Sequence, residues 1–309
     1  MFTIKVYPSV LVLILSYNGK EFLIDAVQSY LDCEYPNFAV AVIDNGSTDG
    51  TEEFIRNNYP NVVFMRSEKN LGYSGGMNIG LAYAFEQNNY DYVLITNNDV
   101  IADKQIIAAL VETAEANPGT AFTTGKVYYY ERQNVFQTVG KSSHPTLVRG
   151  EHLGRGEKDL GQYDRDTELA FCDDIFWLVS RDVYLKTGGY DTEFFLQAED
   201  FDWQLRAKKA GFKIMYSYKA KLWHKESMTI GKSSPLKAYY DARNPMIAIM
   251  KNCNSKQIKY YVIDKSYKLL FKSIPKTFIK GHISKAFASM LGLLSAYKYY
   301  IISKINKII

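Results

Sequence analysis

Short apolar segments alternate with amphipathic helical segments through the first half of the chain, and this alternation limits the fold more than any other feature. Five apolar runs have the length and composition of β-strands, at residues 10–15, 39–43, 62–65, 92–96 and 121–124. Between them, the segments 22–31 and 75–85 repeat apolar side chains at helical spacing. Alternating strands and helices predict an α/β fold with a mainly parallel sheet, right-handed crossovers and helices on both faces.

The pattern changes in the second half. Residues 126–169 are rich in glycine, arginine and acids, and we expect an irregular stretch that reaches over a site. Regular structure is predicted to resume with a strand at 175–180, a helix at 199–210 that Gly211 ends, and a strand at 212–218.

Cysteine usage and the N-terminal sequence indicate the cellular compartment in which the protein is expected. The three cysteines, Cys33, Cys172 and Cys253, are far apart and show no CxxC spacing, which suits a reducing environment. The apolar run at 10–15 is shorter than the hydrophobic segment of a signal peptide, so we expect a buried strand there. Both features predict a cytoplasmic protein.

Lysines are concentrated toward the C-terminus. From Lys251 onward the chain has twelve lysines, no arginine and a single acid, Asp264, which gives this segment a charge of +11. Because the whole chain carries +4, the first 250 residues carry −7. We therefore divide the chain into an acidic N-terminal domain (1–250) and a basic helical tail (251–309).

The tail repeats apolar residues every three or four positions. This predicts a helix with one continuously apolar face, formed by Ile283, Phe287, Met290, Leu294, Tyr297, Ile301, Ile305 and Ile308. The longest uncharged run, 286–297, is shorter than the ~20 residues needed to cross a bilayer, and lysines beside it favour a helix lying on an anionic membrane surface. The alternative is that the apolar face packs on the first 250 residues, or on a second subunit in a homodimer. Nucleic acid is not expected as a partner, because the tail has no arginine for bidentate contacts.

Polar residues follow the first two predicted strands. Ser16 and Asn18 follow the first strand, and Asp44, Asn45 and Ser47 follow the second. Parallel strands end at one edge of a sheet, where open α/β sheets bind ligands, so we expect these side chains to meet there. Asp44 can accept a hydrogen bond from a ribose hydroxyl or a pyrimidine N–H. The alternative is a simple turn in which Ser47 caps the next helix.

A glycine-rich cluster at residues 70–80 forms the third polar segment. It includes Asn70, Gly75 and Gly76 at a predicted helix start, where backbone without side chains lets a nucleotide approach closely. The glycine spacing differs from the GxGxxG pattern of dinucleotide-binding folds. A redox enzyme is therefore disfavoured.

The fourth cluster, Asn97, Asn98 and Asp99, follows the fourth predicted strand. Asp99 is a candidate ligand for Mg²⁺ or Mn²⁺, because such hard cations prefer oxygen donors and can bridge a carboxylate to two phosphate oxygens. A metal there would neutralise the charge that grows on a diphosphate leaving group. The alternative is that Asp99 caps a helix at about residues 102–116.

These four clusters, in this order, resemble the inverting family 2 glycosyltransferases of the GT-A fold, over residues 10–244. The resemblance implies that residues 1–250 form a GT-A catalytic domain, with a donor half at about 1–125 and an acceptor half at about 126–250, which binds a dTDP- or UDP-linked sugar. It implies a donor pocket lined by Ser16, Asn18, Asp44, Asn45, Ser47, Asn70, Gly75, Gly76, Asn97 and Asn98.

The DxD motif of that family matches Asn97-Asn98-Asp99, with asparagine in place of the first acid. This replacement resembles the rhamnosyltransferase-like branch, and it implies that Asp99 shares the metal with a downstream histidine, His224. Considered without the family, a lone histidine is more often structural.

Residues 188–195 (GGYDTEFF), followed by the sequence EDFDW, resemble the acceptor segment and ED motif of the family. The resemblance implies that Asp200 is the base that takes the proton of the attacking hydroxyl, and that Glu199 and Asp202 hold the surrounding acceptor network. Acids at a helix N-terminus are also explained by a favourable interaction with the helix dipole.

Two further residues are candidates for substrate contacts. Trp203 can stack on a sugar face, and Arg243 can bind phosphate oxygens. Both residues can equally be packing residues.

The predicted function is inverting transfer of a sugar, L-rhamnose by analogy with the NND branch, to a lipid-linked or polysaccharide acceptor in cell-surface glycan synthesis. The enzyme is expected on the inner face of the cell membrane. The chain has Gln204-Leu205-Arg206-Ala207 instead of the QxxRW pattern of processive synthases, which favours single addition. A nucleotidyltransferase is disfavoured, because no GxGxR-type loop lies between residues 10 and 22. A catalytically weak, membrane-docked partner protein stays open, since Asn97 replaces an acid.

Overall fold

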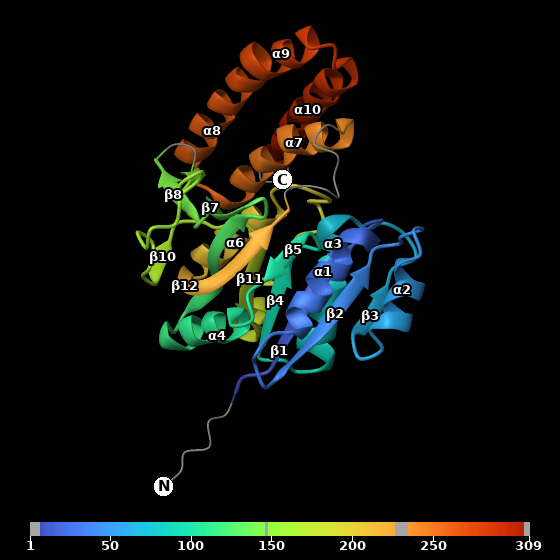
Figure 1. The fold of residues 1–309 in the computed structure, drawn as a ribbon. Helices are drawn as coiled ribbons and strands as arrows, with labels where there is room; N and C mark the ends of the chain where they lie inside the picture. The colour runs from blue at the N-terminus through green and yellow to red at the C-terminus, as the bar shows by residue number, and fades with distance from the viewer. Residues whose placement is uncertain (1–6, 146–147, 226–233, 306–309) are drawn as a thin grey trace.

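The computed structural model describes residues 7–145, 148–225 and 234–305. Within these ranges the strands of the main sheet are β1 (Val10–Ser16), β2 (Phe38–Asp44), β3 (Val63–Arg66), β4 (Tyr92–Thr96), β5 (Val100–Ala102), β6 (Thr120–Tyr129), β7 (Arg132–Thr138), β10 (Thr167–Leu169), β11 (Phe176–Ser180) and β12 (Lys213–His224). They form one sheet in the order β10-β12-β6-β11-β4-β1-β2-β3, with β5 beside β12 and β7 beside β6 (Figure 1).

The sheet is mixed. Its N-terminal part, β3-β2-β1-β4, is entirely parallel, as the alternating sequence pattern predicts. β11 then runs antiparallel between β4 and β6, and β12 runs parallel to β6. The α/β fold class is confirmed.

Helices cover both faces of the sheet. One face carries α1 (Lys20–Leu31), α2 (Thr51–Asn58) and α4 (Ile106–Ala116), and the other carries α3 (Gly72–Ala82) with its extension η1 (Tyr83–Gln87), α5 (Arg181–Thr187) and α6 (Glu199–Lys209). Val10, Val12 and Ile14 of β1 point into the first core, whereas Leu11 and Leu13 point into the second. A strand buried on both faces explains the uninterrupted apolar run in the sequence.

The prediction that residues 126–169 are irregular is wrong in one respect, because this segment contains strands. It holds the end of β6, then β7, a separate hairpin of β8 (Lys141–His144) and β9 (Val148–His152), and β10. In β7 the first three residues are exposed, while Val135 and Phe136 are buried. The strand prediction depends on continuous apolar runs. Strands with one solvent-exposed side have no such run, so these strands were not predicted.

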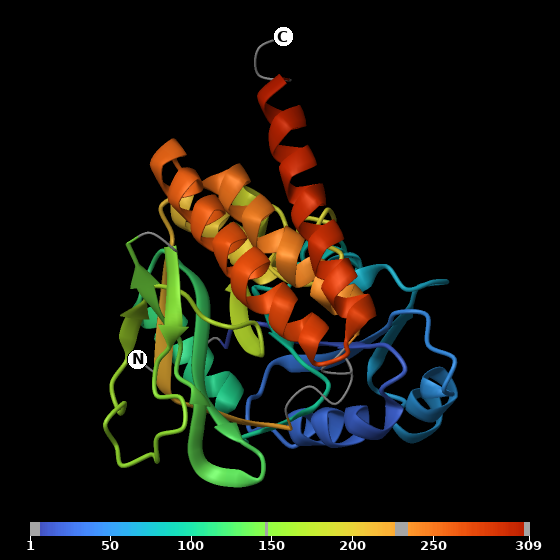
Figure 2. The ribbon, with the colours of Figure 1, turned by 90° about the horizontal axis from the view of Figure 1, so that it is seen from above.

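The C-terminal helices gather beyond the carboxyl ends of the parallel strands (Figure 1). They are α7 (Pro235–Asn252), α8 (Ser255–Lys268), η2 (Leu269–Ser273), α9 (Ile274–Ile279) and α10 (Ile283–Ile305). The predicted boundary after residue 250 falls inside α7. Ile247 and Ile249 of this helix pack with Phe194 and Phe201 of the predicted catalytic domain, which we call the catalytic body. Figure 2 shows the long α10 running beside α7 and projecting away from the sheet.

The apolar stripe of α10 faces outward. Its side chains at Ile283, Phe287, Met290, Leu294, Tyr297, Ile301 and Ile305 are each at least 36% exposed, and Ile308 lies outside the described residues. The opposite side of α10 packs through Ala286, Leu293 and Ala296. Two alanines and one leucine therefore make this contact, and the large side chains of the stripe stay uncovered. None of the helices in the described ranges has both the length and the apolar content needed to cross a membrane.

Candidate active site

The loops after β1 and β2 are joined at the carboxyl edge of the sheet. Ser16 pairs with Asp44 in register, and the Asn18 backbone N–H donates to Ser47 Oγ at 2.9 Å. The Asn18 side chain accepts from the Thr48 N–H at 2.8 Å, and the residue has φ +48°. Ser47 thus binds the neighbouring loop and does not cap α2, which begins after Gly50 without a side-chain cap. These residues come together at one edge, as predicted.

Asp44 is fully buried and ion-paired. Its Oδ1 accepts from the Ser47 N–H at 2.9 Å, and its Oδ2 lies 2.6 Å from Nη1 of Arg66. Arg66, at the end of β3, pairs with Asp44 in register and was not predicted. In the sequence, only the position of Arg66 at the end of its own strand could have indicated a role at this sheet edge.

Asn45 fixes the glycine-rich loop. Its Nδ2 donates to Asn70 Oδ1 at 3.1 Å and to the Gly72 carbonyl at 2.9 Å, and its Oδ1 accepts from the Leu71 N–H at 3.0 Å. Gly72 has φ +74°, and a Cβ there would lie 2.3 Å from the Phe195 carbonyl oxygen. The loop can therefore approach the acceptor segment only with glycine at this position.

Gly75 and Gly76 were expected to make room for a nucleotide. A Cβ at Gly75 would lie 2.8 Å from Leu71 Cβ, and one at Gly76 would lie 2.6 Å from Leu15 Cδ1. Both glycines therefore allow close packing within the chain itself. Donor binding by their backbone stays a prediction.

The side chains of Asp99 and His224 lie next to each other where β5 pairs with β12. His224 Nε2 lies 3.2 Å from Asp99 Oδ1, and both residues are buried. The antiparallel pairing of His224 with Val100 places them together. Asp99 does not cap α4, whose N-cap is Gln105.

This pair suits a divalent metal bound with a diphosphate. His224 Nδ1 lies 2.8 Å from Gln137 Oε1, so a proton on Nδ1 leaves the Nε2 lone pair toward Asp99. Adjacent ligands of an octahedral Mg²⁺ are about 3 Å apart, which matches the separation of the two atoms. No group of three or more such ligands is found in the described part of the chain, so substrate oxygens would have to complete the coordination.

A cluster of four carboxylates lies beside this pair. Asp173 and Asp174 precede β11, and Glu199 and Asp200 open α6. The Asn97 N–H donates to the Ile175 carbonyl at 3.0 Å, which joins the cluster to the NND segment. Asp173 and Asp174 were not predicted, although two adjacent acids directly before a buried strand were a visible signal.

The four acids differ in charge because of their surroundings. The pKa of Asp174 is raised, first by burial and then by the negative charges of Asp200 and Asp173. The pKa of Glu199 is raised well above its usual range, first by burial and then by the negative charges of Asp174 and Asp200. Burial acts to raise the pKa of Asp173 as well, but Lys141 and His152 hold it below its usual range. The surroundings therefore favour the protonated form of Asp174 and Glu199 and the ionised form of Asp173.

Arg149 of β9 contacts the predicted base. Its Nη1 lies 3.0 Å from Asp200 Oδ2, and its guanidinium lies 4.4 Å from the centre of the Phe201 ring. Sequence patterns gave no indication of Arg149, because it falls in the segment expected to be irregular. This arginine gives Asp200 a counter-ion among several acids.

The backbone before α6 is held in an unusual conformation. Gln197 and Ala198 have φ +70° and +69°. Asn244 Nδ2 donates to the carbonyls of Leu196 and Gln197 at 2.7 and 3.0 Å. A left-handed conformation at two successive non-glycine residues costs free energy, and such strain is often found at functional sites.

Arg243, predicted to bind phosphate, is engaged with the acceptor segment. Its Nη2 lies 2.9 Å from Glu193 Oε1, and its Nε donates to Ser295 Oγ at 3.3 Å. It thus links α7 to α10 and to the segment before α6. Phosphate binding by Arg243 stays a prediction.

Two predicted acceptor contacts are corrected. Trp203 is fully buried against Phe122 and Tyr190, and its Nε1 donates to Thr187 Oγ1 at 2.8 Å, so no face of the ring is open to a sugar. Asp202 is also fully buried, and it binds Arg206 and Asn252 at 2.7 Å each. All five residues of the EDFDW sequence are buried, and Asp202 and Trp203 are the two that are completely enclosed.

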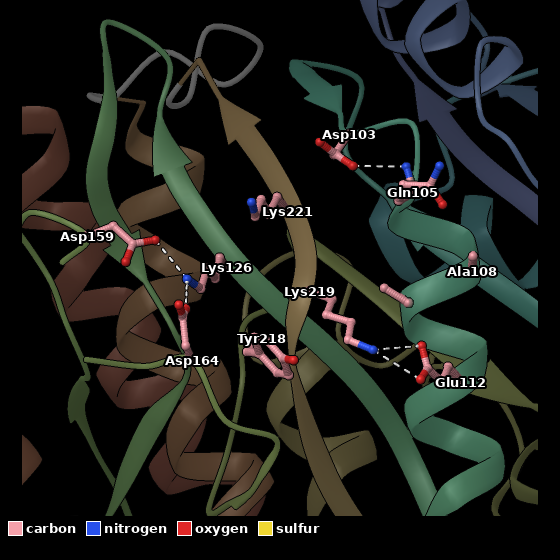
Figure 3. A pocket seen from close by; sticks show the side chains of 11 residues that line it. Asp103, Gln105, Ala108, Glu112, Lys126, Asp159, Asp164, Tyr218, Lys219 and Lys221 are labelled. Atoms are coloured by element: carbon pink, nitrogen blue, oxygen red, sulfur yellow. Dashed lines mark hydrogen bonds and ion pairs between the residues drawn. The ribbon is translucent and has the colours of Figure 1, made fainter. Parts of the chain in front are cut away.

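A cleft of 690 Å³ lies elsewhere, between α4, β6 and β12 (Figure 3). Figure 3 shows its charged side chains pointing to one another: Lys126 toward Asp159 and Asp164, and Lys219 toward Glu112. None of the predicted site residues lines it. We place the active site at the sheet edge, because the chemically suitable groups converge there.

The chain is similar in sequence to known proteins. A family model described as "Glycosyl transferase family 2" matches residues 11–188, more than half of the chain. A poly-beta-1,6-N-acetyl-D-glucosamine synthase of Staphylococcus aureus (strain COL) is 23% identical over 225 residues, which cover 71% of this chain and 50% of the synthase. This chain thus spans about half the length of that relative. An N-acetylglucosaminyl-diphospho-decaprenol L-rhamnosyltransferase of Mycobacterium tuberculosis (strain CDC 1551 / Oshkosh) is 28% identical over 219 residues, 63% of this chain and 68% of the relative.

Solved structures share the fold. S. aureus TarS 1–349 in complex with UDP-GlcNAc aligns with a TM-score of 0.59 at 15% identity, covering 92% of this chain and 79% of that one. Mannosyltransferase PcManGT from Pyrobaculum calidifontis, in complex with GDP-Man and Mn²⁺, aligns with a TM-score of 0.56 at 14% identity, covering 98% and 81%. The GT-A fold is confirmed. From the family match and the fold together, this chain belongs to glycosyl transferase family 2.

Proposed function

We propose that this chain transfers one sugar from a nucleoside diphosphate sugar to a hydroxyl of a lipid-linked saccharide, with inversion at the anomeric carbon. The acceptor oxygen forms a bond to the anomeric carbon while the bond from that carbon to the diphosphate breaks. The electron pair of the broken bond leaves with the nucleoside diphosphate. The hydroxyl proton passes to the Asp200 carboxylate.

One contact supports this proposal more than any other. The hydrogen bond from the Asn97 N–H to the Ile175 carbonyl joins the NND segment to the carboxylate cluster around Asp200. A donor diphosphate at Asp99 and an acceptor hydroxyl at Asp200 would therefore be neighbours. The raised pKa values of Asp174 and Glu199 favour less negative charge around Asp200, which helps a diphosphate to approach.

Asp99 and His224 would hold a divalent metal, Mg²⁺ or Mn²⁺. When bound, such an ion neutralises the charge that develops on the leaving diphosphate. Gln137 orients the His224 ring through Nδ1 and so presents Nε2 to the metal position. Donor binding by Ser16 is supported by its Oγ, which is buried and has no hydrogen-bond partner among the described residues.

The donor we favour is dTDP-L-rhamnose, and the acceptor we favour is a saccharide on a lipid diphosphate. The name of the Mycobacterium tuberculosis relative supports both, since that protein is an N-acetylglucosaminyl-diphospho-decaprenol L-rhamnosyltransferase. The relevant solved structures hold UDP-GlcNAc and GDP-Man, so the fold accepts several nucleotides. A place in cell-surface glycan synthesis follows from such an acceptor.

We infer that the C-terminal helices dock on an anionic membrane, which we take to be the inner face of the cell membrane. Large apolar side chains are exposed on α8, η2, α9 and α10, including Ile263 (58%), Phe271 (70%), Ile279 (84%) and Phe287 (58%). Exposed lysines, Lys272 and Lys276, stand beside them. Apolar side chains combined with cations suit a phospholipid surface better than a second protein subunit.

A second candidate is a catalytically weak partner protein, which the asparagine at position 97 favours. The deciding test is release of nucleoside diphosphate from a panel of donors, with and without Mn²⁺ or Mg²⁺, in wild type and Asp200→Asn. Metal-dependent release from one donor, lost in Asp200→Asn, supports catalysis. A chain that consumes no donor with lipid-linked acceptors present is the partner protein.

A further inference from the structure

A small pocket lies between the catalytic body and the first tail helix. It has a volume of 260 Å³ and is lined by Arg149 of β9, Phe201 of α6, and Tyr261, Asp264, Lys265 and Lys268 of α8. Pockets for drug-sized ligands measure about 300–1,000 Å³, so this one suits a small group more than a whole nucleotide sugar. Three of its six lining residues are cations and only one is an acid.

The charges of this pocket are incompletely compensated. Burial lowers the pKa of the Lys265 ammonium, although Asp241 acts to raise it. Lys268 lies 2.8 Å from Asp264 one turn away on the same helix. An entering anion would add negative charge beside Lys265, where water is largely excluded.

Arg149 links the pocket to the predicted base. Its guanidinium lies over Phe201 at 4.4 Å from the ring centre and contacts Asp200 Oδ2 at 3.0 Å. A planar guanidinium held by a ring can bind phosphate oxygens through two parallel hydrogen bonds. A group bound in the pocket is therefore placed next to the carboxylate that receives the acceptor proton.

We propose that this pocket binds the phosphate of the acceptor, that is, the diphosphate that joins its saccharide to lipid. The inference rests on the proposed function for the identity of the acceptor. Its geometry is suitable, because α8 belongs to the helices that carry the exposed apolar side chains, whereas Arg149 reaches Asp200. A lipid chain can then extend toward the membrane while the saccharide lies at the active site. The phosphate also competes with Asp200 for Arg149 and frees the carboxylate to accept a proton.

A direct binding test does not depend on turnover. Calorimetry with inorganic pyrophosphate, in EDTA to suppress metal-dependent binding at the donor site, compares wild type with the double variant Lys265→Gln/Lys268→Gln. We expect dissociation constants at least tenfold higher in the double variant. Lys186→Gln/Lys219→Gln removes the same charge from exposed, ion-paired lysines of the body and should bind as wild type does. Equal binding by wild type and the Lys265→Gln/Lys268→Gln variant would overturn the proposal.

A kinetic test separates an acceptor phosphate from a phospholipid headgroup. In detergent without phospholipid, KM is measured for a saccharide on a farnesyl diphosphate and for the octyl glycoside of the same saccharide. Lys265→Gln/Lys268→Gln should raise the first KM at least tenfold and the second less than twofold. An unchanged ratio, together with lost binding to phosphatidylglycerol vesicles, would assign the pocket to a headgroup and reject the proposal. Wild type that turns over no donor refutes the proposed function, whereas an unchanged ratio in an active enzyme refutes only this inference.

Discussion

His224 Nε2 lies 3.2 Å from Asp99 Oδ1, at the point where β5 and β12 pair. Both side chains are buried, and the other ring nitrogen of His224 faces Gln137 Oε1. A carboxylate oxygen and an oriented imidazole nitrogen at this separation are ready to share a divalent cation. We propose that His224 supplies the metal ligand that the asparagine at position 97 cannot provide.

Replacing His224 with alanine should weaken metal binding. The variant loses a nitrogen ligand, so we expect the affinity for Mn²⁺, titrated in the presence of UDP or dTDP, to fall at least about tenfold. His282→Ala, which removes an exposed histidine of the tail, is the matched control and should bind Mn²⁺ as wild type does. Equal affinity of wild type and His224→Ala would remove His224 from the metal site.

Asp174→Asn should make stability less dependent on pH. The pKa of Asp174 is raised to about 8 by burial and by Asp200 and Asp173, against an unfolded value of about 3.9. A raised carboxyl pKa contributes stability that is complete below the unfolded value and is lost as pH rises through the folded value. Between about pH 4 and 8, this one group can lower the free energy of unfolding by up to about 1.4 kcal/mol per pH unit.

Urea unfolding at several pH values from 5 to 8.5 checks this expectation. The free energy of unfolding of Asp174→Asn should fall less steeply with rising pH than that of wild type. Asp182→Asn, at an exposed position, should keep the wild-type slope. Parallel curves for wild type and Asp174→Asn would show that Asp174 is not held in its protonated form.

Loss of exposed apolar side chains should release the protein from membranes. Each fully buried Phe or Leu contributes about 1.5–3 kcal/mol, so Phe271→Ser/Phe287→Ser/Leu294→Ser should weaken binding to phosphatidylglycerol vesicles at least about 100-fold. Leu160→Ser/Leu185→Ser, at 86% and 63% exposed positions of the catalytic body, should leave vesicle binding intact. A triple variant that binds vesicles normally but changes from dimer to monomer would instead assign this face to a second copy of the chain.

Trp203→Ala should destabilise the fold without a specific effect on acceptor binding. The indole is fully buried among aromatic rings, so its removal should cost about 3–5 kcal/mol of unfolding free energy. Leu185→Ala, at an exposed position, should change stability by less than about 0.5 kcal/mol. If Trp203→Ala instead unfolded like wild type and only raised the acceptor KM, the predicted sugar-stacking role would be restored.

The sequence allowed prediction of the parts of this molecule that depend on local patterns. Buried parallel strands such as β1 and β2 have continuous apolar runs, and their polar ends mark the sheet edge. The half-solvated strands β7 to β9 have no such run, so Arg149 was missed along with them. Arg66 escaped notice because it acquires its role only from its tertiary neighbour Asp44, whereas Asp173 and Asp174 were overlooked although they precede a buried strand. Trp203 was misassigned because the sequence does not show which side of α6 faces the core.

We propose that Asp200 serves as the base of a metal-dependent glycosyl transfer. The most direct test of this proposal is the rate of nucleoside diphosphate release from dTDP-rhamnose and UDP-linked sugars, with Mn²⁺ and a lipid-linked acceptor, in wild type and Asp200→Asn. A general base contributes about 10²- to 10⁴-fold to rate, so kcat should fall by that amount while the donor KM changes little. Full activity in Asp200→Asn would contradict the account.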